Sequence, residues 1–438
     1  MKKKMLALLL ACLMAFSAFG CGSKQADPGK DGEKKIALTL MIRVQEGVES
    51  TEYTYSELNK WAEEHNIDLT IDNIPREEEF SDKLRTSFAN GDTPNVFVDY
   101  GGSRTLDYIE SGAVACLQPY LDADKEWYDS FYPSYWEDLD YTDEGYPGIY
   151  GVPEKGYTIA LYYNKDIFTQ NNLTPPETFD ELLDVCDKLL QAGIKPFQCG
   201  GKDSYRLGHL HNNIVLKMYG VEGCQALADR TMAYDSPEMI KTYQIISDMA
   251  EKGYLGTALL STDSNTEKAS FYAQESAMMW DGDWRVAGLL LEGQEVYDRT
   301  GVIPFPYFDE KYKDVAQGGL NDSLFVSCLN KSEEEIEASV ELVKFYTSPE
   351  FNAGLYERSP SMCGMKFEHT PDTPANPLLD SIEGFVAGYE AMRTDLQVYD
   401  PATHMLDTVR NALQGLIMGN TPEECGQEIV NRIAEYES

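Results

Sequence analysis

The most constraining feature of the sequence is an alternation of short apolar runs with longer amphipathic segments. The runs at 36–42, 67–71 and 96–98 predict β-strands, and the segments between them have the period of helices. Gly91 follows the second of these segments and predicts the end of a helix. Strands that alternate with helices favour an α/β layer with a parallel sheet.

The same alternation continues through the second half of the chain. Residues 158–163 predict a further strand, and residues 323–327 another. Four helix starts carry capping or proline signals: Thr178 with Glu181, Ser236 with Pro237, Ser332 with Glu335, and Thr421 with Pro422. A chain of 438 residues is long enough for two domains, so we predict two α/β lobes.

The N-terminus has the pattern of a targeting segment. Three lysines precede an apolar stretch at 5–19, which is too short for a transmembrane helix, and small residues then lead to Cys21 and a Gly-rich linker. This resembles a bacterial lipobox, which implies a signal peptide at 1–20 and a lipidated Cys21 followed by a flexible linker to residue 35. Cys12 also fits the pattern, and an ordinary cleaved signal peptide is the alternative.

Charge and motif content disfavour several classes of function. The formal net charge of −38 disfavours binding to nucleic acid, to anionic membrane surfaces and to polyanionic ligands. No other segment is apolar enough to span a bilayer, so the mature protein would be held at the membrane by lipid alone. We find no nucleophile elbow, phosphate loop, dinucleotide fingerprint or zinc-protease motif, and we predict no catalytic residue, no metal and no cofactor.

The nine cysteines have neither the spacing of a zinc site nor that of a disulfide framework. Cys186 and Cys425 fall on apolar helix faces, which favours buried free thiols. A Cys199–Cys224 pair stays open. His209 and His211 are candidate metal ligands, but no third ligand clusters with them, so a sheet or surface role is favoured.

Several segments, in order, resemble the extracellular solute-binding proteins of ABC importers, the family that includes the maltose-binding protein. They lie at 88–98, 112–117, 151–153, 161–168, 175–182, 271–284, 344–350 and 415–425. The three segments between 151 and 182 resemble the family's "YNKDLF … PPKTWDEL" pattern almost residue for residue. The resemblance covers the chain from about residue 36 to the end.

The resemblance implies a two-lobed periplasmic-binding-protein-like fold, in which each lobe is a mostly parallel sheet flanked by helices. Lobe one would comprise 36–156 plus 305–346, and lobe two 157–304 plus 347–438. The implied function is that of a monomeric, non-enzymatic lipoprotein on the outer face of the cytoplasmic membrane, which captures a sugar in a cleft at the hinge and delivers it to permease subunits. A peptide or other polar metabolite as ligand, and a secreted glycoside hydrolase, are the alternatives.

Candidate ligand contacts come from the resemblance and from strand ends. Trp284 matches the family's "NGSW" aromatic, and a flat ring suits the apolar face of a sugar. Trp280 and Asp281 precede it in the same segment, and the carboxylate of Asp281 can accept hydrogen bonds from sugar hydroxyl groups. Further candidates at the ends of strands or at the first crossing between lobes are Asp99, Tyr100, Arg43, Glu46, Tyr157, Asn321 and Asp322. For each of these seven, a turn or surface role is the alternative. For Trp284 and Trp280 the alternative is packing in the core, and for Asp281 it is capping a turn.

Overall fold

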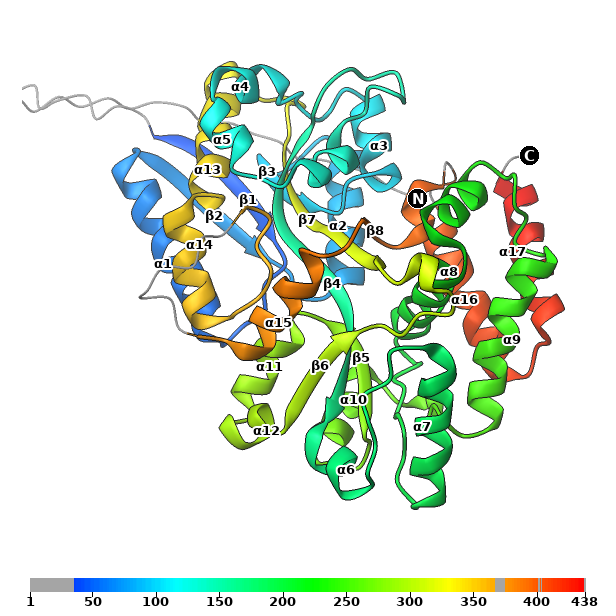
Figure 1. Cartoon of the computed structure of the whole chain (residues 1–438). Helices are drawn as coiled ribbons and strands as arrows, with labels where there is room; N and C mark the ends of the chain where they lie inside the picture. Colours follow the sequence, from blue (N-terminus) through cyan, green and yellow to red (C-terminus); the bar gives the residue numbers. More distant parts are fainter. Residues whose placement is uncertain (1–34, 367–374, 401, 403, 437–438) are drawn as a thin grey trace, which may run out of the picture. The chain divides into compact units, whose positions relative to one another are not determined.

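The computed structural model describes residues 35–366, 375–400, 402 and 404–436. The α/β body begins at Ile36 (Figure 1). The predicted signal peptide, Cys21 and Cys12 lie outside the described residues. Within the described ranges, none of the helices combines the length and the apolar character that crossing a membrane requires.

The described residues form one eight-stranded sheet. Its strands are β1 (Ile36–Ile42), β2 (Ile67–Asn73), β3 (Val96–Asp99), β4 (Gly151–Asn164), β5 (Met278–Gly282), β6 (Thr300–Pro304), β7 (Val315–Val326) and β8 (Ala391–Arg393). The main path runs β2-β1-β3-β7-β4-β5, with β6 on β4 and β8 on β7. All the strands predicted from the sequence are present, and the mixed α/β class is confirmed.

The direction of the strands differs from the prediction in one half of the sheet. β1 is parallel to β2 and β3, as expected. β4, however, is antiparallel to β5, β6 and β7, and β3 is antiparallel to β7. β4 and β7 are long strands that run side by side in opposite directions, and an antiparallel pair needs no crossover helix. β8 is parallel to β7. The expectation of a mostly parallel sheet in each lobe therefore holds for β1–β3 and is wrong for the strands that pair with β4.

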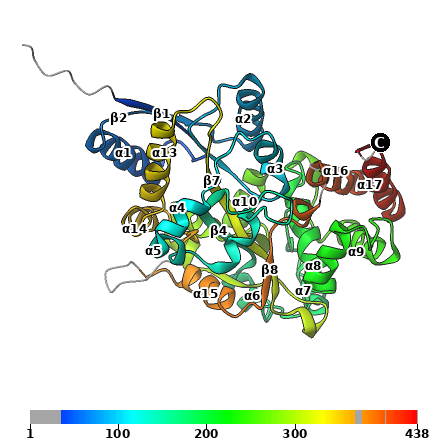
Figure 2. The ribbon, with the colours of Figure 1, turned by 90° about the horizontal axis from the view of Figure 1, so that it is seen from above.

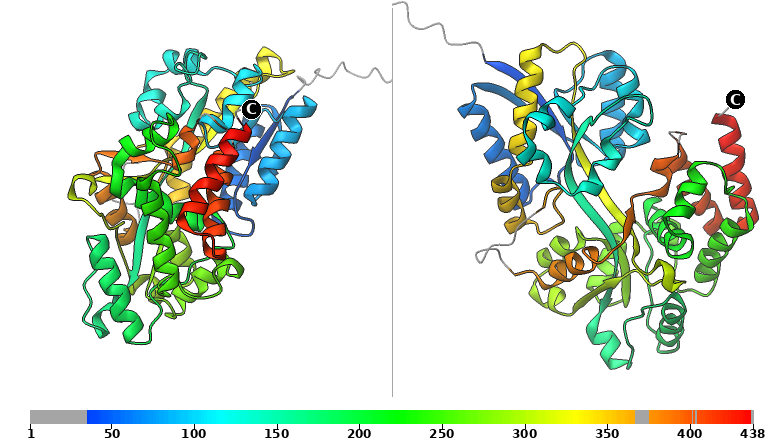
Figure 3. Two further views of the ribbon diagram at one scale, coloured as in Figure 1. Left: turned by 90° about the vertical axis from the view of Figure 1, so that its right-hand side faces the viewer. Right: turned by 45° about the horizontal axis from the view of Figure 1, so that its top comes forward.

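Helices cover the sheet on both sides (Figures 2 and 3). They are α1 (Glu49–Glu64), α2 (Glu77–Asn90), α3 (Ser103–Glu110), α4 (Gln118–Ala123), α5 (Lys125–Asp129), α6 (Lys165–Gln170), α7 (Phe179–Gln191), α8 (Tyr205–Ala228), α9 (Pro237–Glu251), α10 (Ser264–Tyr272), α11 (Arg285–Leu291), α12 (Gln294–Asp298), α13 (Glu333–Tyr346), α14 (Pro349–Arg358), α15 (Pro377–Val386), α16 (Met405–Met418) and α17 (Pro422–Tyr436). Short 3₁₀ turns are η1 (Pro133–Tyr135), η2 (Glu137–Leu139), η3 (Leu259–Ser261), η4 (Glu310–Tyr312) and η5 (Leu396–Tyr399).

The predicted helix boundaries are confirmed by their hydrogen bonds. Thr178 and Ser332 each form a complete capping box, at the starts of α7 and α13. Ser236 caps α9 by accepting from the backbone of Met239. Gly91 ends α2 with a φ of 71°, a left-handed conformation that glycine adopts without strain.

Three hydrophobic clusters form the core. One joins β1–β3 to α1, α2 and α13, and a second joins β4 and β5 to α7, α8, α9, α16 and α17. The third packs the other face of β4 against α11 and α15. The seven cysteines in the described ranges are all free, and Cys186, Cys199, Cys224 and Cys425 are buried, so the predicted buried thiols are confirmed and Cys199 is not bonded to Cys224.

Gly364 is where the segment before α15 touches β4 most closely. Its backbone N–H donates to the carbonyl of Glu154 at 3.0 Å, and a Cβ at Gly364 would lie 2.7 Å from backbone atoms of Pro153 and Glu154. We expect Gly364→Ala to lower the free energy of unfolding by about 1–3 kcal/mol, because the backbone of β4 cannot move aside cheaply. Gly384→Ala in α15 is the matched control, because a Cβ there meets no atom within 4 Å. Equal midpoints of urea unfolding for the two variants would contradict this packing.

Candidate ligand-binding cavity

An open cavity of about 440 Å³ lies at the carboxyl end of β3. The start of α3 and η2 form one side, η5 and α16 form the opposite side, and the pair β4 and β7 contributes the base. The lining residues are Glu77, Tyr100, Gly101, Gly102, Arg104, Asp138, Tyr157, Leu320, Asn321, Thr394, Asp395, Val398, Leu406 and Arg410. A hollow between two sets of elements, at the carboxyl end of a strand, is in the usual position of a small-molecule site.

Tyr100 is held between two guanidinium groups. The guanidinium carbons of Arg43 and Arg104 lie 4.7 and 4.4 Å from the centre of its ring, and Arg43 Nη1 donates to its hydroxyl at 2.8 Å. Burial raises the pKa of the Tyr100 phenol, so the ring stays neutral. These contacts fix the ring of Tyr100 at the edge of the cavity.

The arginines on this side are already paired with carboxylates. Arg43 Nη2 lies 2.6 Å from Asp322 Oδ1, while Arg104 lies 3.3 Å from Glu77 Oε1 and 3.6 Å from Asp99 Oδ1. Although burial opposes ionisation, Arg43 and Arg104 lower the pKa of Glu77, which is therefore a carboxylate at neutral pH.

Across the cavity, Arg410 is paired with Asp395. Arg410 Nη2 donates to Asp395 Oδ2 at 3.0 Å, and the other oxygen of Asp395 accepts from Asn212 at 2.6 Å. Arg410 Nε is buried and has no hydrogen-bond partner among the described residues. Burial raises the pKa of Asp138 to about 6, against the opposing effects of Arg393 and Tyr399. The cavity thus presents hydrogen-bonding groups of both charges from both sides.

The structure divides the predicted contacts at strand ends into three groups. Tyr100, Tyr157 and Asn321 line the cavity. Arg43 and Asp99 do not line the cavity but bind the lining residues Tyr100 and Arg104, and Asp322 binds Arg43. Glu46 is exposed and accepts hydrogen bonds from Tyr55 and Asn73, away from the lining residues.

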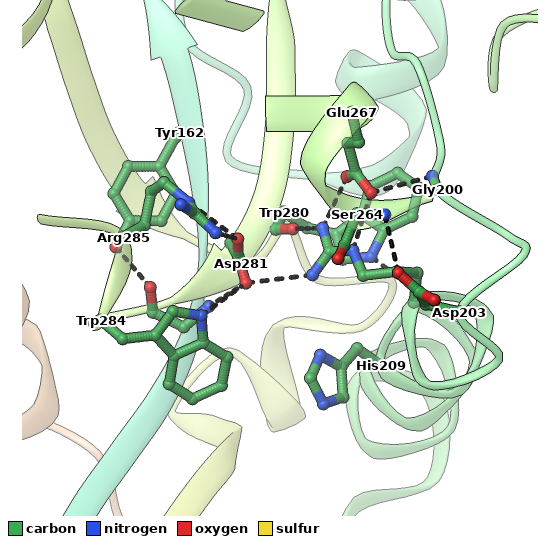
Figure 4. A network of polar contacts seen from close by, with 12 residues as sticks. Tyr162, Gly200, Asp203, His209, Ser264, Glu267, Trp280, Asp281, Trp284 and Arg285 are labelled. Atoms are coloured by element: carbon green, nitrogen blue, oxygen red, sulfur yellow. Dashed lines mark hydrogen bonds and ion pairs between the residues drawn. The ribbon is translucent and has the colours of Figure 1, made fainter. Parts of the chain in front are cut away.

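Trp280 and Asp281 lie inside the protein and not on the cavity surface (Figure 4). Trp280 is 1% exposed, and its indole N–H donates to the carbonyl of Arg206 at 3.1 Å. Asp281 is also buried and is held between Arg206 and Arg285, which lower the pKa of its carboxyl although burial opposes them. Trp280 therefore takes its alternative role in the core, where the carbonyl of Arg206 satisfies its N–H. The two arginines satisfy the carboxylate of Asp281, so neither side chain is placed to contact a ligand in this cavity.

Trp284 is half-buried and packs behind the lining. Its ring stacks on Tyr157 with 5.9 Å between centroids, and His209 lies 6.3 Å away. Trp284 is not among the lining residues of this cavity, so its role as a sugar contact stays a prediction. His209 and His211 are buried in α8, and His211 stacks on Tyr243, so the surface or sheet role is wrong for both.

Sequence reasoning missed Glu77, Arg104, Asp138, Asp395 and Arg410. Glu77 and Arg104 lie in the first turns of the helices after β2 and β3, where the strand-end rule that selected Asp99 and Tyr100 applies equally. Asp138, Asp395 and Arg410 lie in turns or mid-helix, where the local sequence gives no such signal.

Comparison with known proteins decides the family. The family model described as bacterial extracellular solute-binding protein matches residues 47–353. The chain belongs to this family. The position of the cavity, between two lobes and beside the β4–β7 pair, fits a solute-binding protein.

Relatives of this solute-binding protein share about half of its length. It is 26% identical over 243 residues to the multiple sugar-binding protein of Streptococcus mutans serotype c, covering 52% of this chain and 55% of that one. It is 28% identical over 232 residues to the sn-glycerol-3-phosphate-binding periplasmic protein UgpB of Yersinia enterocolitica, covering 50% and 49%. The chain therefore spans about half the length of the curated relatives it matches.

Solved structures match over nearly the whole chain. A chitin oligosaccharide binding protein superposes with a TM-score of 0.81 at 24% identity, covering 92% of this chain and 99% of that one. Maltose-bound MalE3 of T. maritima gives 0.73 at 19% identity, covering 91% and 99%. These similarities show the two-lobed fold.

Asp283 is a buried carboxylate that links three segments near the cavity base. Its side chain accepts from the backbone N–H groups of Thr158 at 3.3 Å and Met362 at 2.8 Å. The residue is 1% exposed and forms no ion pair within the described ranges. Burial raises the pKa of Asp283 to about 7, against the effect of the two backbone donors.

We expect this raised pKa to make stability depend on pH. In the folded state the carboxyl of Asp283 keeps its proton up to about pH 7, whereas in the unfolded chain it loses the proton near the ordinary pKa of about 4. The stabilisation by the protonated form is therefore fully present below pH 4 and is lost as the pH rises to 7. The free energy of unfolding of the wild type minus that of Asp283→Asn should therefore fall between pH 4 and 7, by roughly 1–4 kcal/mol. Asp143→Asn, which changes an exposed carboxylate, is the control. A difference that is constant over this range would contradict the account.

Proposed function

We propose that this solute-binding protein captures a neutral sugar or short oligosaccharide outside the cell and delivers it unchanged to the permease of an ABC importer. The two lobes, 36–156 with 305–346 and 157–304 with 347–438, close on the ligand. The family, the names of the sugar-binding relatives and the cavity support this function.

The observation that carries the proposal is the mixed lining of the cavity. Two tyrosine side chains lie among carboxylate, guanidinium, amide and hydroxyl groups in this lining. A sugar has an apolar C–H face and a ring of hydroxyl groups that both donate and accept, so it satisfies such a lining. Carboxylates such as those of Glu77 and Asp395 accept stronger hydrogen bonds from hydroxyl groups than neutral acceptors do.

The charges favour a neutral ligand over a phosphate ester, although some relatives are named for sn-glycerol-3-phosphate. Arg104 is already paired with Glu77 and Asp99, and Arg410 with Asp395. A phosphate would have to displace these carboxylates and would meet Asp138 as well. Like charges in a partly desolvated site repel strongly, so an anion gains little here.

The lipid tether is part of the same proposal. Cleavage after residue 20 and acylation of Cys21 would hold the protein at the outer face of the cytoplasmic membrane, with residues 22–35 as a flexible linker. A tethered binding protein stays within reach of a permease, which suits the delivery of captured ligand. Metabolic labelling with a fatty acid, lost in Cys21→Ala and retained in Cys12→Ala, tests this assignment.

Thermal-shift measurements test the ligand class. We expect maltose, N,N′-diacetylchitobiose or xylobiose to raise the Tm, because binding to the folded state alone stabilises it by mass action, whereas sn-glycerol-3-phosphate and dipeptides leave it unchanged. The bound sugar should be recovered intact by chromatography. Stabilisation by the phosphate ester or by dipeptides alone would overturn the sugar assignment, and cleavage products would indicate a glycoside hydrolase.

A further inference from the structure

A network of four buried charges links α8, α10, β5 and α11 (Figure 4). Arg206 on α8 binds Glu267 on α10 through two contacts of 2.6 and 2.8 Å, and it reaches Asp281 on β5 at 3.0 Å. Arg285 on α11 closes the network by binding the other oxygen of Asp281. All four side chains are buried, so two guanidinium groups balance two carboxylates without exposed charge.

Asp281 is the member of this network that reaches an aromatic side chain. Its Oδ1 accepts from Arg206, from the backbone of Gly282 at 2.9 Å and from the indole N–H of Trp284 at 3.0 Å. Its Oδ2 accepts from Arg285 Nε at 2.8 Å and from Arg285 Nη2. With these donors in place, the carboxylate has no lone pair left for a ligand hydroxyl.

The indole of Trp284 is restrained on three sides. Its N–H is bound by Asp281, its ring lies so close over Gly282 that a Cβ there would be 2.4 Å from it, and Tyr157 stacks against it. Tyr157 in turn lines the cavity. The network therefore connects to the cavity wall through Asp281, Trp284 and Tyr157, in that order.

We infer that Asp281 is a positioning residue, which fixes the indole of Trp284 against Tyr157 so that the aromatic wall of the cavity is in place before a ligand enters. The two buried arginines hold the carboxylate in one orientation, and the carboxylate holds the ring. A wall that is already ordered loses less conformational entropy on binding, which raises affinity. This inference rests on the proposed function, because it assigns the wall to a ligand.

Trp284→Phe tests the positioning role of Asp281 by changing the aromatic side chain instead of the carboxylate. The variant keeps an aromatic ring over Gly282 but removes the N–H donor, so the two arginines keep their carboxylate partner. We expect it to weaken the affinity for maltose, N,N′-diacetylchitobiose or xylobiose by roughly three- to tenfold, as expected for one lost hydrogen bond, and Trp284→Ala by tenfold or more. Trp127→Phe is the matched control, because it removes an indole hydrogen bond of 3.1 Å to Thr347 that is remote from the cavity lining.

Fluorine NMR of protein labelled with 5-fluorotryptophan tests, without any ligand, whether Asp281 fixes the indole of Trp284. The chain has five tryptophans, and the resonance missing from Trp284→Phe is that of Trp284. We expect this resonance to be narrow in the wild type, shifted or broadened in Asp281→Ala, and restored in Asp281→Asn, which keeps an acceptor oxygen. A loss of stability alone would not move the Trp284 signal while those of Trp61, Trp127 and Trp136, which lie in another cluster, stay in place.

The two readouts separate the inference from the proposed function. An unchanged Trp284 resonance in Asp281→Ala, or wild-type affinity in Trp284→Phe, would overturn the positioning role. If Asp281→Ala does not fold, the comparison of Trp284→Phe with Trp127→Phe decides. If none of the three sugars binds the wild type, the sugar proposal fails, and the fluorine spectra still decide whether Asp281 orders the indole.

Discussion

The antiparallel pairing of β4 with β7 is the constraint on which the rest of the structure depends. The two strands pair from Gly151 opposite Phe325 to Thr158 opposite Gly318, with register shifts beside Lys155. β3 pairs with β7 on one side, and β5 and β6 pair with β4 on the other. One hydrophobic cluster packs around the strands on the β3 side, and another packs around those on the β5 side. The cavity lies where these two sides meet, and Tyr157 and Asn321 reach it from the β4–β7 pair. A bulge in such a ribbon changes the direction of its side chains, which places lining residues on it.

The charged groups behind the cavity wall are buried and paired, whereas those at the wall are paired and accessible. Behind the wall, Arg206, Glu267, Asp281 and Arg285 are fully buried and neutralise one another. Removing one member of such a group typically costs about 3–5 kcal/mol, because an unpaired charge is left in the interior. At the wall itself, the pairs of Arg104 with Glu77 and of Arg410 with Asp395 remain accessible from the cavity. These surface pairs offer a polar ligand donors and acceptors that are already oriented.

Much of the fold was predictable from local sequence. The periodicity at 36–42 and 67–71 and the capping boxes at Thr178 and Ser332 are local signals, and the structure confirms each of them. Strand direction in the second half was not predictable, because it depends on β7 returning beside β4 from about 160 residues further along the chain. The site was partly predictable: Tyr100 follows from the strand-end rule, whereas Arg410 reaches the cavity through the packing of α16 on α8. The sequence predicts Asp281 as an acceptor for sugar hydroxyl groups or as a turn cap, because no local signal indicates that Arg206 and Arg285 bind it.

The central claim is that the cavity beside the β4–β7 pair holds the ligand. Hydrogen–deuterium exchange with and without a stabilising sugar is its most direct test. Backbone amides at 100–104, 317–322 and 394–398 border the cavity from its two sides and its base. The account predicts that the sugar slows exchange in all three segments together, because closure of the lobes orders both walls at once. Slower exchange confined to a part of the chain away from these segments, with the cavity borders unchanged, would contradict it.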